Sequence, residues 1–319
     1  MKYAIGIDLG GTNLKIAAVT PKGRVISYTV RKSRIVKDRK TAVRNLVRCI
    51  RDIEKSIKGK HLIGVGAGIA GTVKTDKGIV SQSPNLPELE GTNLKDEISD
   101  ILSCPFFIDN DANVFAMGEG WCGSAKDCKN FCGITLGTGV GGGIVIDGRI
   151  FHGSCGAAGE VGHIVVEPMG AQCRCGSFGC LEAYASSTGL VRMAIDDFYS
   201  RNAVSLRRLC NNNKKKITPE VIARLAERGD SFCISLFEMV GTYLGIAMAD
   251  IVNLLNPELI VIGGGLSKSA HLFLNTAKKE FKRRSLKAAG KNIKIVTASS
   301  DKAGVVGAAY MVLKRFGAI

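Results

Sequence analysis

The chain has 319 residues, 45% hydrophobic and 23% charged, a composition that permits one large or two ordinary cores and excludes a disordered protein. Its formal charge of +16, from 44 basic and 28 acidic residues, would suit a polyanion such as nucleic acid or polyphosphate. The bases are spaced as solvated helix faces, without interleaved aromatic residues, so we favour that interpretation and expect no nucleic-acid partner.

The amino terminus and the cysteines both favour a protein that stays where it is made. The opening MKYAIGIDLGG reaches Asp8 and contains no apolar run of signal-peptide length. The most apolar later segment, residues 234–255, is interrupted by Glu238 and Asp250 and therefore predicts a buried helix, not a membrane span. The 11 cysteines are then expected to be reduced. We expect a cytoplasmic protein without a membrane partner.

The first half of the chain alternates β-branched apolar runs with helical patterns. We expect strands at residues 3–9, 14–20, 25–30, 61–68 and 105–108, and helices at about 41–57 and 94–102. From residue 132 the pattern of strand, glycine-rich turn and strand begins again, and residues 6–12 align with residues 133–139. The sequence therefore predicts an internal duplication.

The second half continues the alternation. We expect helices over about residues 181–255, from about residue 270 and at 304–314, and strands at 259–262 and 293–296. Strands alternating with helices in two similar halves predict an α/β protein with two domains around a cleft. We assign a small domain to residues 1–112 and a large one to 113–302, with the closing helix (303–319) packing back on the small domain.

Two stretches match the dinucleotide pattern G-x-G-x-x-G, at residues 66–71 and 137–142. That pattern binds a pyrophosphate only where it opens a helix. Here the first stretch runs into TVKTDKG and the second into the apolar run 144–146. Neither stretch therefore meets the requirement for dinucleotide binding. The signatures of Walker-A proteins and protein kinases are missing from the sequence.

A strand–turn–strand cradle for phosphates remains, and it occurs twice. In DLGGTNLK, Gly10 and Gly11 permit a tight turn, Thr12 adds a hydroxyl, and Asp8 offers a carboxylate to a magnesium ion (Mg²⁺). A plain hairpin would explain the glycines but neither Asp8 nor Thr12. The second turn is LGTGVGGG, and a third cluster, VIGGG, closes a buried strand where a ribose or adenine could approach. Together these features suit a nucleoside triphosphate.

The motifs IGIDLGGTNLKIAAV, LGTGVGGG and VIGGG resemble the phosphate and adenosine motifs of the actin and hexokinase ATPase superfamily. GAAGEVGH with CRCGSFGCLE is similar to the ROK family of repressors and sugar kinases. The resemblance covers essentially the whole chain and implies a duplicated actin-like ATPase (ribonuclease H-like) fold. Repressors of the family carry an extra amino-terminal helix-turn-helix domain, and a first strand that begins by residue 4 leaves no room for one.

The resemblance also implies which residues bind the nucleotide and which bind the acceptor. The expected nucleotide-binding residues are Asp8, Gly10, Gly11, Thr12, Lys15, Gly137, Thr138, Gly139, Gly263, Gly264 and Gly265. The expected sugar-binding residues are Asn85, Asn110, Asp111, Glu160, His163 and Glu182. For Glu182, a position at a helix start favoured by the helix dipole explains the sequence equally well without the resemblance.

Carboxylates and amides occupy four of the five positions from 109 to 113, in IDNDAN. These positions end a strand and precede a helix, but capping the helix needs one such residue. Phosphoryl transfer to a hydroxyl needs a base within hydrogen-bond reach, and Asp111 is the candidate, with Asn110 orienting a sugar. Asp111 also matches the catalytic aspartate of ROK sugar kinases.

The segment CRCGSFGC places Cys173, Cys175 and Cys180 within eight residues, and His163 lies ten residues upstream. Zinc prefers four such ligands in a tetrahedron. A disulfide would leave one thiol unpaired, and an iron–sulfur cluster would need a fourth nearby cysteine. We favour a structural Zn²⁺ ion, and the spacing is that of the ROK zinc motif.

The resemblance implies an ATP-dependent hexose kinase acting on the 6-hydroxyl, with ATP, Mg²⁺ and structural Zn²⁺ as cofactors and a homodimer or homotetramer as its state. Residues 147–153 and 156–160 are more similar to bacterial glucokinases than to N-acetylglucosamine kinases, so glucose is the favoured hexose. The alternatives are kinases of N-acetylglucosamine, N-acetylmannosamine, fructose, mannose or allose, a polyphosphate-dependent glucokinase, and a non-catalytic sugar-sensing ROK protein.

Overall fold

The computed structural model describes residues 1–32, 38–57 and 59–319. The chain forms two compact units. Unit 1 comprises residues 1–133, 142–159 and 298–319, and unit 2 comprises residues 134–141 and 160–297. The domain boundary expected between residues 112 and 113 stays a prediction.

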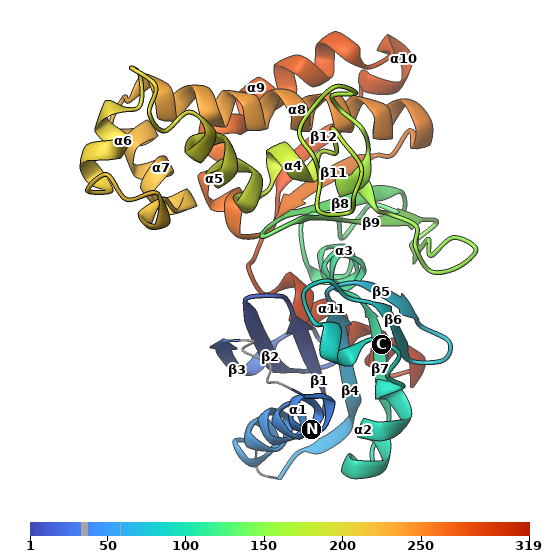
Figure 1. Cartoon of the computed structure of the whole chain (residues 1–319). Helices are drawn as coiled ribbons and strands as arrows, with labels where there is room; N and C mark the ends of the chain where they lie inside the picture. Colours follow the sequence, from blue (N-terminus) through green and yellow to red (C-terminus); the bar gives the residue numbers. More distant parts are fainter. Residues whose placement is uncertain (33–37, 58) are drawn as a thin grey trace. The chain divides into compact units, whose positions relative to one another are not determined.

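The first five-stranded sheet has the strand order β3-β2-β1-β4-β7 (Figure 1). Its strands are β1 (Lys2–Leu9), β2 (Asn13–Val19), β3 (Val25–Lys32), β4 (His61–Ile69) and β7 (Phe106–Asn110). The first three pair antiparallel, whereas β4 runs parallel to β1 and β7 runs parallel to β4. The carboxyl ends of β1, β4 and β7 therefore meet at one edge, where Asp8 pairs with Gly68 and Gly68 with Asp109.

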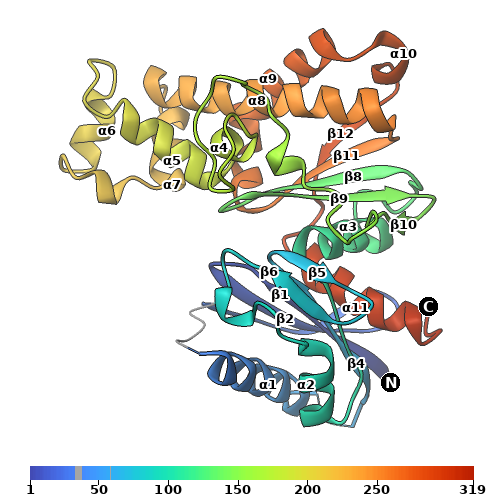
Figure 2. The same cartoon turned by 45° about the vertical axis from the view of Figure 1, so that its right-hand side comes forward.

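Helices cover both faces of this sheet (Figures 1 and 2). They are α1 (Arg39–Lys55) and α2 (Leu94–Leu102) on one face, and α3 (Asp111–Cys122) and α11 (Ala303–Arg315) on the other. Alternate residues of β1 point to opposite faces. Ile5 and Ile7 belong to the core under α1 and α2, whereas Ala4 packs with Val305 of α11. The period-two pattern of the strand thus builds two separate cores.

Helix α11 lies very close to its neighbours because glycines replace side chains at the contacts. A Cβ atom at Gly6 of β1 would lie 1.8 Å from the carbonyl oxygen of Val305, and one at Gly307 would lie 1.7 Å from that of Val114 in α3. This close packing brings the first turn of α11 to the end of β1. A Cβ at Gly304 would lie 2.9 Å from Oδ2 of Asp8.

The second five-stranded sheet has the order β10-β9-β8-β11-β12. Its strands are β8 (Phe131–Leu136), β9 (Val140–Ile146), β10 (Arg149–Ile150), β11 (Leu259–Gly263) and β12 (Lys294–Thr297). Strands β9 and β10 pair antiparallel, and β11 and β12 pair parallel. When the strands are numbered along the chain within each five-stranded sheet, both sheets have the order third, second, first, fourth and fifth strand. This order confirms the internal duplication.

The remaining helices belong to unit 2. They are α4 (Glu182–Ala185), α5 (Ser187–Asp196), α6 (Val204–Leu209), α7 (Pro219–Glu227), α8 (Ser231–Leu255), α9 (Ala270–Arg284) and α10 (Lys287–Gly290). Within the described ranges, α8 alone is long and apolar enough to cross a membrane by length and composition. Most of its apolar window is buried, and α9 runs along it in both views (Figures 1 and 2). The buried helix expected at residues 234–255 is confirmed.

The expected strands and helices are all present among the described residues, and their ends shift by a few positions. One feature was not expected, a two-stranded hairpin of β5 (Thr72–Lys74) and β6 (Ile79–Gln82) that follows β4. The hairpin was not predicted because its strands are short. The turn between them, residues 75–78 (TDKG), is typical of a longer loop.

Candidate functional site

The turn between β1 and β2 carries the first group of expected nucleotide-binding residues. Its backbone closes through a 3.1 Å hydrogen bond from the Gly10 N–H to the Asn13 carbonyl. Asp8 and Lys15 face each other across the two strands, and Lys15 Nζ lies 3.2 Å from Asp8 Oδ2. Burial lowers the pKa of Lys15 and the Asp8 carboxylate raises it, with a net upward shift. Lys15 is therefore a cation at neutral pH, held at the base of the turn.

Asn85 lies directly against this turn. A Cβ atom at Gly11 would lie 3.0 Å from both Cβ and Cγ of Asn85. A side chain at position 11 would therefore require Asn85 to move by a few tenths of an ångström. The structure thus brings an expected sugar-binding residue and an expected phosphate-binding residue of unit 1 together.

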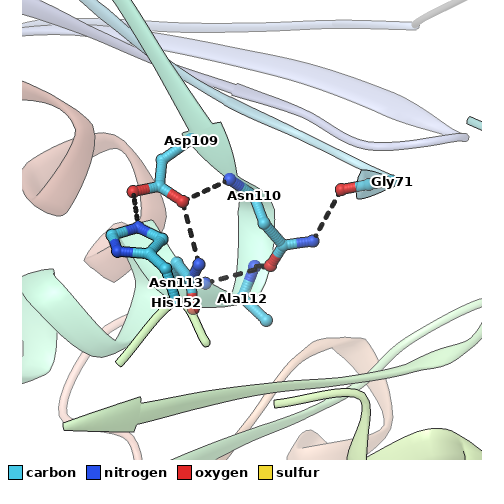
Figure 3. A network of polar contacts seen from close by, with 6 residues as sticks. All are labelled: Gly71, Asp109, Asn110, Ala112, Asn113 and His152. Carbon is cyan, nitrogen blue, oxygen red and sulfur yellow. Dashed lines mark hydrogen bonds and ion pairs between the residues drawn. The ribbon is translucent and has the colours of Figure 1, made fainter. Parts of the chain in front are cut away.

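The amino terminus of α3 is built around the side chain of Asn110 (Figure 3). Its Oδ1 accepts hydrogen bonds from the backbone N–H groups of Ala112, at 2.8 Å, and Asn113, at 3.1 Å. Its Nδ2 donates to the carbonyl of Gly71 at 3.0 Å. Asn110 is therefore the N-cap of α3 and also ties this helix to the end of β4. Helix capping, the alternative explanation for the polar residues at positions 109–113, is therefore observed for Asn110.

Asp111 is the first residue of α3 and is partly exposed. Its Oδ1 accepts the backbone N–H of Ala112 at 2.9 Å, so the carboxylate lies at the positive end of the helix. A Cβ atom at Gly68 of β4 would lie 3.2 Å from the Cα of Asp111, which places the first turn of α3 directly on the sheet edge.

Asp109 forms a polar centre that sequence reasoning missed (Figure 3). Its side chain is 3% exposed, and its Oδ2 lies 2.8 Å from Nε2 of His152. Its Oδ1 accepts from the Asn110 N–H at 2.7 Å and from Asn113 Nδ2 at 2.8 Å. The hydrogen bond to Asp109 raises the pKa of His152, and burial opposes the shift. No spacing rule links residues 109 and 152, so the sequence carried no signal for this pair.

In unit 2 the second glycine turn is fixed by its neighbours. Gly137 donates to the carbonyl of Gly139 at 2.9 Å and accepts from the Ser187 N–H at 2.8 Å. The hydroxyl of Thr188 donates to the carbonyl of Thr138 at 2.7 Å. The amino terminus of α5 thus holds the turn in place.

The third glycine cluster, residues 263–265, packs on the strand that leads into this turn. Gly264 has a φ of 86°, and a Cβ atom there would lie 2.3 Å from the carbonyl oxygen of Leu136. Glycine is required by both the backbone conformation and the close approach. The expected adenosine motif and the expected second phosphate motif therefore lie side by side in unit 2.

His163, Cys173, Cys175 and Cys180 form the thiol cluster, in which one ligand atom from each residue lies within 4.8 Å of every other. Cys173 Sγ is 3.8 Å from His163 Nδ1, and Cys175 Sγ is 3.7 Å from Cys180 Sγ. Burial raises the pKa of the Cys173 thiol to about 12, so this thiol becomes a thiolate at neutral pH only beside a cation. The donor set and its compactness fit a tetrahedral metal ion.

Glu182 connects the thiol cluster with the second glycine turn. Its Oε2 accepts the backbone N–H of Val140 at 2.9 Å, and the Cys173 thiol donates to its Oε1 at 3.9 Å. Burial raises the pKa of Glu160, His163 lowers it and Glu182 raises it. Glu160, His163 and Glu182, the three sugar-binding residues expected in this part of the chain, thus lie within electrostatic reach of one another in unit 2.

Comparison with known proteins connects these features to one family. A sequence model described as the ROK family matches residues 4–315. This chain belongs to the ROK family. Within the family, a glucokinase from Halalkalibacterium halodurans is 38% identical over 98% of this chain and 96% of that protein. A xylose repressor from Caldicellulosiruptor bescii is 33% identical over 97% of this chain but only 77% of the repressor.

A solved ROK structure extends the similarity to the fold. The ROK family glucokinase from Streptomyces griseus, in complex with glucose and AMPPNP, is 32% identical and matches 97% of this chain and 98% of that one with a TM-score of 0.85. The α/β architecture and the actin-like ATPase fold of ROK sugar kinases, expected from the motifs, are thereby confirmed.

The contact between Glu182 and the second glycine turn predicts that substitution by alanine will affect stability differently at Gly139 and at Gly137. In Gly139→Ala the new methyl group would lie 2.2 Å from Glu182 Oε2 and displace the carboxylate from the Val140 N–H. We expect a loss of about 1–3 kcal/mol in the free energy of unfolding, measured by urea denaturation. In the control Gly137→Ala, the nearest atom is 3.9 Å away, and stability should not fall. Equal stability of the two variants would contradict this account of the turn.

Proposed function

We propose that this ROK protein is an ATP-dependent hexose kinase that phosphorylates the 6-hydroxyl of glucose. The observation that carries the proposal is the sheet edge of unit 1, where the Asp8 turn and Asp111 stand at the carboxyl ends of strands in one parallel register. A phosphate-binding turn and a candidate base on one rigid edge are what phosphoryl transfer to a hydroxyl requires. Glucose is supported by the relatives named glucokinase and by the glucose-bound structure.

Asp111 would act as the general base. As the sugar O6 attacks, the O6–Pγ bond forms, the bond from Pγ to the bridging oxygen breaks, and ADP leaves while the hydroxyl proton passes to the carboxylate. The Ala112 N–H fixes the orientation of this carboxylate. Asn110, through its cap and its bond to Gly71, would keep the turn rigid during the reaction.

The nucleotide would be held by backbone groups of both glycine turns. Gly10, Gly11 and Thr12 in unit 1, and residues 137–139 in unit 2, would cradle the phosphates, and residues 263–265 would admit the adenosine. Lys15 supplies a positive charge beside Asp8. Asp8 would hold Mg²⁺, which when bound neutralises charge on the β- and γ-phosphates.

Glu160, His163 and Glu182, together with Asn85, would recognise the sugar hydroxyls. Buried carboxylates discriminate well, because a sugar lacking the matching hydroxyl leaves them unpaired. We propose that the thiol cluster binds a structural Zn²⁺ ion, which fits its three thiols and one imidazole. With Nδ1 of His163 next to Cys173, the other ring nitrogen is left for the sugar. The ion would then fix the acceptor residues by geometry without taking part in the chemistry.

A coupled assay with purified, zinc-replete protein tests the function. The panel is glucose, mannose, fructose, allose, N-acetylglucosamine and N-acetylmannosamine, each with ATP and with polyphosphate. We expect the highest kcat/KM for glucose with ATP. A second candidate is a non-catalytic sugar sensor, favoured by the 33% identity to a xylose repressor, and sugar binding without turnover on any hexose would establish it.

The family resemblance also supports three further parts of the proposal, namely a domain division after residue 112, a homodimer or homotetramer, and a cytoplasmic location. Analytical ultracentrifugation distinguishes the dimer from the tetramer.

Asp111→Asn should separate binding from chemistry. The amide keeps the size of the side chain but cannot accept the proton, so we expect kcat to fall by about 10²- to 10⁴-fold, as steady-state kinetics would measure. The glucose Kd, measured by calorimetry, should change by less than about threefold, because the hydrogen-bonding shape is retained. Asp100→Asn, at an exposed position of α2, is the control and should leave kcat unchanged. Near-normal turnover of Asp111→Asn would remove this residue as the base.

Cys175→Ser should test the zinc clamp. Loss of one of four ligands should abolish stoichiometric zinc, as measured by atomic emission, and raise the glucose Kd by about tenfold or more because Glu160 and Glu182 lose a common anchor. Cys155→Ser, at an exposed cysteine outside the thiol cluster, should change neither quantity. If Cys175→Ser lost its zinc and kept its glucose affinity, the clamp hypothesis would be wrong.

A further inference from the structure

The Asp109 carboxylate is almost fully buried, yet it accepts hydrogen bonds on both oxygens. Oδ1 takes the Asn110 N–H and the Asn113 amide, which are local contacts within four residues. Oδ2 takes Nε2 of His152, which is 43 residues away in the sequence. A buried carboxylate that loses a partner carries a large penalty. His152 is therefore the long-range contact on which the burial of Asp109 depends.

Formation of α3 does not explain this arrangement. Asn110 already caps the helix through two backbone N–H groups, so the helix has its cap without Asp109. What Asp109 adds is a pair of hydrogen bonds to one residue before Asp111 and one residue after it at the start of the helix. It fixes the Asn110 peptide immediately before Asp111 and the Asn113 side chain one half-turn later (Figure 3).

His152 also begins a compact loop of unit 1, residues 152–159. The His152 carbonyl accepts the Ala158 N–H at 3.2 Å, which closes the loop. Gly156, with a φ of 85°, packs where a Cβ atom would lie 2.7 Å from the Val73 carbonyl, and one at Gly159 would lie 2.6 Å from the Gly142 carbonyl. The loop is thus fastened to its surroundings at several points, and the next residue in the chain is Glu160. The His152 side chain joins this loop to the turn that carries Asp111.

We propose that His152 is a positioning residue that, through Asp109, holds the turn carrying Asp111 and fastens to it the loop that leads to Glu160. The proposal rests on the proposed kinase function of Asp111. It assigns a role to two residues that touch neither phosphate nor sugar in that function. Loss of the contact should release the Asn110 peptide and the Asn113 side chain, so that the base samples unproductive orientations.

The test compares two substitutions of His152 in the full chain, assayed with glucose and ATP. His152→Ala removes the donor to Asp109, and we expect kcat to fall about tenfold or more while the KM for ATP stays within about twofold. His152→Gln keeps a nitrogen donor at the same number of bonds from the backbone as Nε2, and kcat should return to within about threefold of the wild type.

Amide hydrogen exchange supplies a readout independent of turnover. Exchange at residues 109–114 and 152–158 should speed up in His152→Ala and return towards the wild-type rate in His152→Gln. His271→Ala is the matched control. His271 also pairs with a carboxylate, since its Nε2 lies 3.1 Å from Oε1 of Glu227, but the side chains of both residues are at least half exposed. It should alter neither kcat nor exchange at these segments.

Two results would overturn the proposal. They are a wild-type kcat in His152→Ala, even where exchange at both segments becomes faster, and a His152→Gln variant as impaired as His152→Ala. If the wild-type chain phosphorylates no hexose, the proposed function fails instead. The exchange comparison then decides alone whether His152 holds the turn.

Discussion

Parallel hydrogen bonding between β1, β4 and β7 is the constraint on which the polar architecture of unit 1 depends. It aligns Asp8, Gly68 and Asp109 in one row across the sheet, so that the chain leaves all three strands at the same edge. Neighbouring strands lie about 4.8 Å apart, which sets the first turn and the start of α3 roughly two strand spacings from each other. The spacing of these two segments is therefore set by backbone pairing before any side chain contributes.

In unit 2 a single carboxylate has the corresponding importance. Glu182 contacts the backbone of the second glycine turn at Val140 and reaches Cys173 of the thiol cluster. The thiol cluster and the second glycine turn are thus connected by one side chain. In this arrangement a displacement of the thiol cluster reaches the second glycine turn through one side chain.

Local sequence patterns predicted most of the fold. The close approaches between segments that are distant in the sequence could not be predicted from such patterns. The apolar run of β1 predicted the strand because a strand buried on both faces is apolar along most of its length, and the spacing from Cys173 to Cys180 predicted a metal site because short loops bring such ligands together. The contact of Gly11 with Asn85 and the pairing of Asp109 with His152 depend on tertiary structure. His152 stands in an ordinary loop sequence, so no residue pattern could reveal its partner.

The glycine-rich contacts of α11 bear on how the protein is made. Ala4, Ala17 and Val19 of the first sheet are covered by this helix, which begins at Ala303 and so is synthesised about 290 residues after β1 ends at Leu9. Until then the ribosome-bound chain must keep one apolar face of its first sheet without its native cover, a state that favours aggregation or capture by a chaperone. Completion of unit 1 is consequently a late, post-synthetic event, while unit 2 has all its strands and helices available earlier.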